Sequence, residues 1–268
     1  MSKSIVVTGS TRGIGRGLAE NFLKLGAKVC VSGRSESDVK ALVKKLETAY
    51  NAEYVTGAAC DITDSKQLAI LWATAAKAFG TVDVWINNAG ISIDRKPLWE
   101  LPPEDIMKIV DINLGGALLS ARQALIGMTQ QGHGQIWLME GYGSDGMSGA
   151  GMVSYGATKR GVNYLIKALH KDAKDTGVQI CALSPGIVVT DLLIGDYDLS
   201  SDEWKKTKKI MNILADKVET VTPWLAENVL KTDKSGARVA WLTKGKAFKR
   251  FAGASFNKRD LFADLPGA

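Results

Sequence analysis

Tyr155 and Lys159 are two side chains whose types and spacing could carry acid–base chemistry, because they lie four residues apart in the segment YGATK. On a helix this spacing places both on one face. A free tyrosine has a pKa near ~10 and is a poor acid–base partner at neutral pH. A neighbouring ammonium group favours the phenolate and lowers that pKa. We therefore expect Tyr155 to exchange a proton with a substrate oxygen.

A glycine-rich turn, TGSTRGIG, joins an apolar strand pattern to the first helical pattern. Glycine permits a tight turn and a close approach of the backbone to a phosphate. The helix that follows directs its free N–H groups and its positive dipole end at a pyrophosphate. The turn predicts dinucleotide binding by Gly9, Ser10, Thr11, Arg12, Gly13, Ile14 and Gly15.

The second strand pattern ends in VSGRS and lacks the acidic residue with which NAD enzymes usually bind the ribose 2′-hydroxyl. Ser32 and Gly33 leave space at this end. Arg34 offers a permanently charged fork that suits a 2′-phosphate, and Arg12 adds a second cation. The pattern predicts NADPH as the cofactor; the alternative is that both arginines are simply solvated.

The elements that must position these residues form a regular alternation. Strands are predicted at 4–8, 28–32, 53–58, 82–87, 135–139, 179–184 and 238–242, and helices at 13–25, 36–50, 65–79, 103–130 (with a break) and 153–175. Apolar strands separated by helices predict a parallel sheet covered on both faces. The expected fold is α/β: a single-domain Rossmann-type doubly wound parallel sheet of about seven strands over residues 1–268.

The alternation stops after Ser184, and residues 186–216 carry no clear strand pattern. They include the helix-like stretch DEWKKTKKIMNIL, in which Trp204 and Met211 lie opposite the lysines. This segment leaves the carboxyl end of a strand, where ligands bind in such sheets. We predict that residues 186–216 form a substrate lid, with an ordinary surface helix as the alternative, and that residues 244–268 form a C-terminal extension.

Taken together, these motifs resemble the short-chain dehydrogenase/reductases. TGxxxGxG, the NNAG of Asn87–Gly90, Asn113, Tyr155 and Lys159 occur in the order of that family, over roughly residues 4–243. The resemblance implies that Lys159 binds the nicotinamide ribose and that Asn113 holds a water linking this lysine to solvent. It also implies a homodimer or homotetramer formed through the long fourth and fifth helices.

The same resemblance implies further cofactor contacts along the chain. Asp61 and Ile62 match the adenine contact, Asn88, Ala89 and Gly90 match the nucleotide-side wall, and Pro185, Gly186, Val188 and Thr190 match the loop that grips the nicotinamide amide.

The family's catalytic serine, which hydrogen-bonds the substrate carbonyl, has no obvious counterpart. The apolar segment that leads into WLMEGYGSDG (137–146) ends at Glu140 and Gly141, where the family has serine. We favour Ser144 as the catalytic replacement; Tyr142, the more distant Ser148, or no side-chain donor are the alternatives. A bare carboxylate beside an oxyanion would hinder reduction, so Glu140 is expected to have a structural partner.

The altered loop resembles one branch of the family, the chlorophyll(ide) b reductases, through GSDG, LSPGIVVTDLL and MNILAD. The branch implies NADPH-dependent reduction of a tetrapyrrole formyl group to hydroxymethyl. A substrate of that size needs a wide, apolar, partly open cleft, and Leu192, Leu193, Ile194 and Trp204 of the lid could form its wall. Small aldehydes, ketones or 3-oxoacyl thioesters are alternative substrates. A non-catalytic NADP(H)-sensing protein is the alternative from another class.

Composition limits the partners. A net charge of +6 mildly favours anionic partners and is too small and dispersed to predict nucleic-acid binding. Three scattered cysteines, Cys30, Cys60 and Cys181, predict reduced core thiols, and no cysteine or histidine cluster predicts a metal site.

Cellular placement is read from the two ends of the chain. The strand pattern begins at once, which predicts a cytoplasmic protein, or a plastid-stromal one if a transit peptide has been removed. No apolar run approaches the ~20 residues of a membrane span. The basic-aromatic tail WLTKGKAFKRF could touch a membrane surface; a strand followed by a solvated extension is the alternative.

Overall fold

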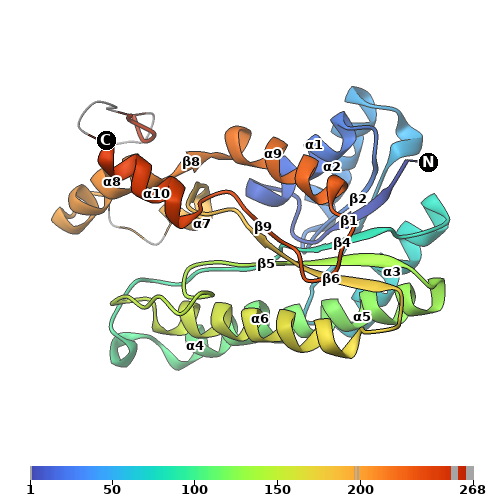
Figure 1. The fold of residues 1–268 in the computed structure, drawn as a ribbon, viewed down its shortest axis with the longest axis horizontal. Coiled ribbons are helices and arrows are strands. Elements are labelled where there is room, and N and C mark those ends of the chain that lie inside the picture. Colours follow the sequence, from blue (N-terminus) through green and yellow to red (C-terminus); the bar gives the residue numbers. More distant parts are fainter. Residues whose placement is uncertain (1, 196, 198, 255–258, 264–268) are drawn as a thin grey trace.

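The computed structural model describes residues 2–195, 197, 199–254 and 259–263, and its central feature is a parallel sheet (Figure 1). Its strands are β1 (Ser4–Val7), β2 (Lys28–Gly33), β3 (Val55–Ala59), β4 (Val84–Asn87), β5 (Gly134–Met139), β6 (Val178–Ser184) and β9 (Arg238–Ala240). The seven strands lie in the order β3-β2-β1-β4-β5-β6-β9. The predicted doubly wound sheet is confirmed, and the strand ends differ from the predicted ones by at most two residues.

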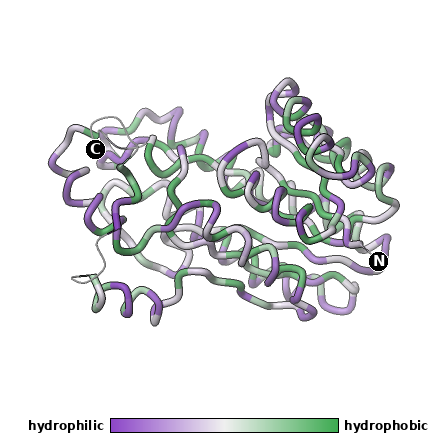
Figure 2. Tube along the Cα trace, turned by 90° about the horizontal axis from the view of Figure 1, so that it is seen from above, coloured by the Kyte–Doolittle hydropathy of each residue, from purple (hydrophilic) through white to green (hydrophobic). Residues whose placement is uncertain are grey.

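Helices cover both faces of the sheet. One face carries α1 (Gly13–Lys24), α2 (Glu36–Ala49) and α9 (Val218–Lys231); the other carries α3 (Ser65–Phe79), α4 (Pro103–Val110), α5 (Ala117–Gln131) and α6 (Val153–Asp172) (Figure 1). Hydrophobic and hydrophilic residues alternate along the helical turns (Figure 2). In α2, for example, the buried residues Val39, Leu42 and Leu46 recur every three or four positions.

Neighbouring residues of each strand supply two different cores. In β1, Ile5 and Val7 face the core under α1, α2 and α9, whereas Val6 faces the core under α3, α5 and α6. In β4, Trp85 likewise faces the second core, between neighbours that face the first. This alternation follows from the two-residue period of a strand. It explains why the strands read as continuous apolar runs, since full burial of each large side chain contributes ~1.5–3 kcal/mol.

The predicted break in the fourth helix is a π-helical turn, Asp111–Gly116, between α4 and α5. Such turns are often found at functional sites, and this one carries Asn113. The continuous helical segment Pro103–Gln131 is long and apolar enough to cross a membrane, by length and composition alone. This segment was not predicted from long apolar runs in the sequence. Part of the run is buried, because α5 packs on β4, β5 and α3.

The segment after β6 contains structure that was not predicted. The expectation of no strand within residues 186–216 is wrong, because β7 (Val188–Val189) pairs in parallel with β8 (Asp216–Lys217). Two-residue strands are too short to produce a readable period. Helix α9, with Pro223 inside it, was also missed. Helices α7 (Asp191–Ile194), α8 (Asp202–Leu214) and α10 (Lys244–Ala252) complete this region.

The C-terminal residues pack against the predicted lid. Trp204 and Met211 of α8 form a buried cluster with Ala215 and Phe262. Trp204 stacks edge-on against Phe262, with ring centroids 5.2 Å apart. The expectation that Trp204 forms part of an open apolar wall is therefore wrong, because its ring lies inside this cluster. Residues 196, 198, 255–258 and 264–268 of the predicted lid and extension lie outside the described residues.

All three cysteines are buried free thiols. Burial raises the pKa of Cys30 and of Cys60 to about 12. Thiols of this kind stay protonated and unreactive at neutral pH, so these side chains serve the core.

Candidate functional site

The glycine turn forms a cradle that only glycine can build. Gly9 and Gly13 have φ angles of 61° and 56°, which disfavour other residues. A Cβ at Gly9 would lie 2.8 Å from the Cα of Ala89, and one at Gly15 only 2.4 Å from the carbonyl oxygen of Gly9. Helix α1 begins at Gly13, and Arg12 places no side-chain cap on its first N–H groups. These N–H groups can therefore bind a phosphate.

The NNAG segment is hydrogen-bonded to this cradle. The side-chain amide of Asn88 donates to the carbonyl oxygens of Thr8 and Gly9, at 2.9 and 3.0 Å. In return the Thr8 hydroxyl accepts hydrogen bonds from the backbone N–H groups of Asn88 and Ala89. The Asn88 side chain thus fixes the shape of the turn.

The end of β2 lies against the same turn and exposes one cation. The buried Ser10 hydroxyl accepts a bond from the Ser32 N–H at 2.8 Å, which ties the turn to the strand. A Cβ at Gly33 would lie 2.8 Å from a Thr11 methyl group, so this corner has no room for a side chain. Arg34, the next residue, is exposed. The corner can therefore present a guanidinium to a ribose phosphate and offers no carboxylate.

The remaining predicted cofactor residues lie in two places. The carboxylate of Asp61 accepts bonds from the N–H and hydroxyl of Thr63, while Ile62 is buried. Farther along the chain, a methyl group of Thr190 lies 3.5 Å from the position of a Cβ on Gly13. The loop predicted to grip the nicotinamide thus lies beside the glycine turn.

Lys159 is a buried cation beside Tyr155. The residue is 7% exposed, and its ammonium nitrogen lies 5.8 Å from the centroid of the Tyr155 ring. The ammonium donates to the Met139 carbonyl oxygen at 3.3 Å. Removal from water disfavours the charged form and lowers the pKa of Lys159 to about 8.

Asn113 approaches this pair from the π-helical turn. Its side-chain oxygen accepts from the Ile91 N–H at 2.8 Å, and its amide donates to the Ile91 carbonyl at 2.9 Å. A Cβ at Gly90 would lie 3.1 Å from the Asn113 oxygen and 3.9 Å from the Lys159 ammonium. The fold therefore gathers Asn113, Gly90, Tyr155 and Lys159 at one place.

Gly141 occupies the strand end beside the tyrosine. A Cβ at this position would lie 2.6 Å from the Tyr155 hydroxyl and 3.1 Å from the Lys159 Cε. With the tyrosine in this position, no side chain fits at residue 141. Of the hydroxyl candidates, Ser148 is exposed, and the Tyr142 hydroxyl lies 2.6 Å from the position of a Cβ on Gly149.

Ser144 closes the loop behind Gly141. Its buried hydroxyl accepts from the Gly141 N–H at 3.0 Å and donates to the Lys159 carbonyl at 3.2 Å. Both bonds go to backbone groups, one after the end of β5 and one on α6. The contacts place Ser144 where it fixes the loop against α6.

Glu140 has structural partners, as expected from the sequence. The residue is 4% exposed; its carboxylate accepts from the Asn163 amide at 3.1 Å and from the Arg238 guanidinium at 2.8 Å. Arg238 was not singled out in the sequence. It lies 98 residues from Glu140, and only the pairing of β9 with β6 brings it there. The carboxylate is thus engaged by α6 and β9.

Comparisons with known proteins agree with this geometry. The family described as short chain dehydrogenase matches residues 3–198. Chlorophyll(ide) b reductase NOL, chloroplastic, of Arabidopsis thaliana is 37% identical over 92% of this chain and 72% of its own length.

Two solved structures share the fold. The 3-ketoacyl-(acyl-carrier-protein) reductase of Brucella melitensis, complexed with NADH, has a TM-score of 0.76 at 24% identity and covers 89% of this chain and 96% of its own. A variant of actinorhodin polyketide ketoreductase with NADPH has a TM-score of 0.76 at 26% identity, with the same coverage. The cradle, the strand order and the family match lead to one conclusion: this chain belongs to the short-chain dehydrogenase family, and it is an oxidoreductase that uses a nicotinamide cofactor.

Proposed function

We propose that this protein is an NADPH-dependent carbonyl reductase whose substrate is the formyl group of chlorophyll(ide) b or of a similar tetrapyrrole. The observation that carries the reaction class is the Tyr155–Lys159 pair on α6, next to the glycine cradle. The substrate class rests on the likeness to the Arabidopsis chlorophyll(ide) b reductase over 92% of the chain.

The site suits a phosphorylated dinucleotide. The cradle leaves the first N–H groups of α1 free for the pyrophosphate, and Arg12 and Arg34 are both exposed beside it. The bound cofactor would supply the hydride. Asp61, Asn88, Gly90 and Thr190 are proposed to shape the rest of its binding groove.

Proton transfer falls to Tyr155. As the carbonyl carbon gains hydride, its oxygen takes the hydroxyl proton of Tyr155, and the aldehyde becomes an alcohol. The ammonium of Lys159 stabilises the phenolate that remains, and a water held near Asn113 can return the proton. Only the burial of Lys159 makes its charge effective, because a water-exposed charge is screened.

Tyr155 is proposed to act without a side-chain hydrogen-bond donor at residue 141, the position just beyond the end of β5. Gly141 leaves that position open, which suits a bulky ring carrying the formyl group. Ser144, proposed from the sequence as the catalytic replacement, is favoured by its contacts as a positioning residue that holds Gly141 beside Tyr155. Leu192, 43% exposed on α7, is proposed to line the cleft.

The preference for NADPH rests on Arg34. We expect Arg34→Ala to reduce the ratio of kcat/KM with NADPH to that with NADH about 10- to 100-fold, because a charged hydrogen bond to the 2′-phosphate is lost. Exposed Lys40, in the helix that follows, provides a matched control as Lys40→Ala. Equal use of both cofactors by the unmodified protein would contradict the proposal.

The cellular setting and assembly are further parts of the proposal. The chloroplastic relative favours the plastid stroma over the cytoplasm. A homodimer or homotetramer through α4–α5 and α6 is supported by exposed apolar side chains on those helices, Leu118 on α5 and Tyr164 on α6. Static light scattering with Tyr164→Glu tests this surface.

The deciding experiment is NADPH turnover with chlorophyllide b, measured beside simple aldehydes, ketones and a 3-oxoacyl thioester. We expect the highest kcat/KM with chlorophyllide b, and loss of turnover in Tyr155→Phe. A higher kcat/KM with a small carbonyl compound would replace the substrate class while keeping the chemistry. Tight NADPH binding without turnover of any carbonyl would instead favour the sensing protein.

A further inference from the structure

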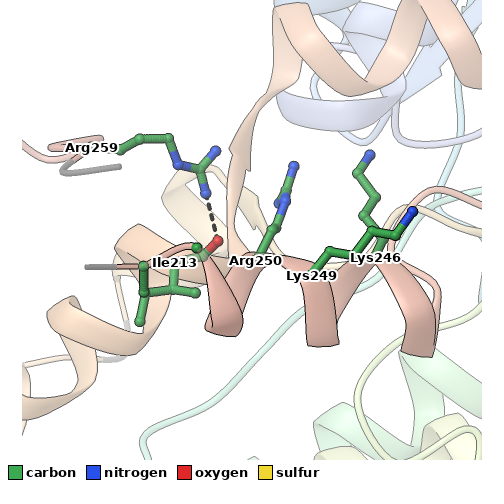
Figure 3. A pocket seen from close by; sticks show the side chains of 7 residues that line it. Ile213, Lys246, Lys249, Arg250 and Arg259 are labelled. Atoms are coloured by element: carbon green, nitrogen blue, oxygen red, sulfur yellow. Dashed lines mark hydrogen bonds between the residues drawn. The ribbon is translucent and has the colours of Figure 1, made fainter. Parts of the chain in front are cut away.

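A cavity lined by cationic side chains lies where α8 and α10 meet Arg259 (Figure 3). Its volume is about 270 Å³, and it is lined by Ile213, Lys246, Lys249, Arg250, Gly253, Ala254 and Arg259. None of these residues belongs to the candidate active site. We propose that this cavity is a binding site for a small oxyanion, a phosphate or carboxylate group.

The two arginines build the frame of the cavity around one buried carboxylate. Asp216, 4% exposed, pairs with Arg250 at 2.8 Å and with Arg259 at 2.9 Å. The Trp241 indole donates to the same carboxylate at 2.6 Å. Its charge is therefore shared by two cations and an N–H donor.

The arginines also cap the end of α8. Arg250 donates to the Leu214 carbonyl at 2.8 Å, and Arg259 donates to those of Ile213 and Ala215 at 2.7 and 3.0 Å. Cations stabilise the negative end of a helix. These bonds fix both guanidinium groups, so the frame is already in place before a ligand arrives.

The two lysines are left without an ion-pair partner among the described residues. The Lys246 ammonium lies 3.0 Å from the centroid of the Trp241 ring, and Lys249 projects from the next turn of α10. Burial, and then the positive charge of Arg250, lower the pKa of Lys246, although the Asp216 carboxylate acts in the opposite direction. The nearby carboxylate of Asp260 pairs with Lys208 at 3.6 Å.

The excess of positive charge around the cavity favours an anionic ligand. The lining carries four cations, and Asp216 supplies one negative charge behind it. An anion would reduce the repulsion among these cations. Lysines bind oxyanions as point charges, and the arginine frame holds them close together. A cavity of this size admits a phosphate or carboxylate group and is below the usual range for a whole drug-sized ligand.

The position of the cavity links it to the cofactor loop. Asp216 lies opposite Val188 in the β7–β8 ladder, and its N–H donates to the Ile187 carbonyl at 3.0 Å. The same loop reaches Thr190, which lies beside the glycine turn. An anion that fastens α10 onto α8 would therefore also stabilise the predicted lid beside the nicotinamide.

Phosphate binding tests this site by calorimetry on the full chain, against sodium chloride of matched ionic strength. We expect Lys246→Gln and Lys249→Gln each to raise the Kd for inorganic phosphate about tenfold. Lys244→Gln, on the same helix but outside the cavity, is the matched control and should change it less than twofold. Circular dichroism verifies that each variant is folded.

Two further sets of titrations distinguish this cavity from the Arg34 site and a phosphate ligand from a carboxylate ligand. Because phosphate could also bind at Arg34, the titrations are repeated in an Arg34→Ala background, where the effect of the two lysines should persist. Acetate and succinate replace phosphate in parallel, and tighter binding of either identifies a carboxylate ligand. Phosphate and carboxylate binding no stronger than the chloride effect, or equal in all three lysine variants, would overturn the proposal. The readout is independent of turnover, so it stands apart from the proposed activity.

Discussion

Two buried charged side chains, Asp216 and Lys159, differ in how fully neighbouring groups compensate their charge. Asp216, between α8 and α9, receives two arginines and an indole N–H. Lys159, in the candidate active site, donates to the Met139 carbonyl, has no ion-pair partner among the described residues, and has a lowered pKa. A structural charge is fully compensated, whereas a charge that must act on a substrate is kept available. The difference teaches that under-compensation, more than burial itself, marks the functional site.

The largest effect should come from removing the available charge. Lys159→Met is expected to lower kcat/KM about 10²–10⁴-fold, as is Tyr155→Phe, because each removes part of the proton-transfer pair. Since burial penalises the ammonium, Lys159→Met should also raise the free energy of unfolding at neutral pH by about 1–3 kcal/mol. Steady-state kinetics and urea unfolding measure the two effects; a destabilised Lys159→Met would break the comparison.

The compensated charge should behave in the reverse way. Asp216→Asn is expected to lower the free energy of unfolding by about 3–5 kcal/mol, because Arg250 and Arg259 lose their buried partner. Asp260→Asn, which removes a carboxylate that is half exposed, is the matched control and should change stability little. Thermal unfolding distinguishes them, and similar Tm values for both variants would refute the assignment.

A smaller effect is expected from filling the open strand end. Gly141→Ala places a methyl group against the Tyr155 hydroxyl, so kcat should fall about 10- to 100-fold as the tyrosine is displaced. Gly156→Ala, in the same helix as the tyrosine, meets open space and serves as the control. An unchanged kcat in Gly141→Ala would show that the tyrosine tolerates displacement.

The smallest expected effect is the dependence of kcat/KM on pH. Lys159 loses its proton as pH rises through about 8, so kcat/KM of the free enzyme should decline above that value. The unfolded lysine keeps its proton to about 10.5. Between these values the unfolded state binds more protons, so the contribution of Lys159 to stability rises with pH. Loss of the decline in Lys159→Arg, measured on residual activity, would support the assignment.

The sequence by itself determined the elements and motifs that depend on local order. Strand and helix periodicity located the seven-stranded sheet, the glycine spacing located the cradle, and the four-residue step from Tyr155 to Lys159 put both on one helix face. Each of these is settled within a few neighbouring residues, by backbone sterics and side-chain period.

Only the tertiary structure decided which distant groups meet. The Glu140–Arg238 pair spans 98 residues and depends on β9 joining β6, and the bond from Arg259 to Asp216 spans 43. The two-residue strands β7 and β8 become visible only as a pair, and Trp204 turns inward because Phe262 covers it. Such contacts form when separate elements pack together, and no local period of the chain encodes them.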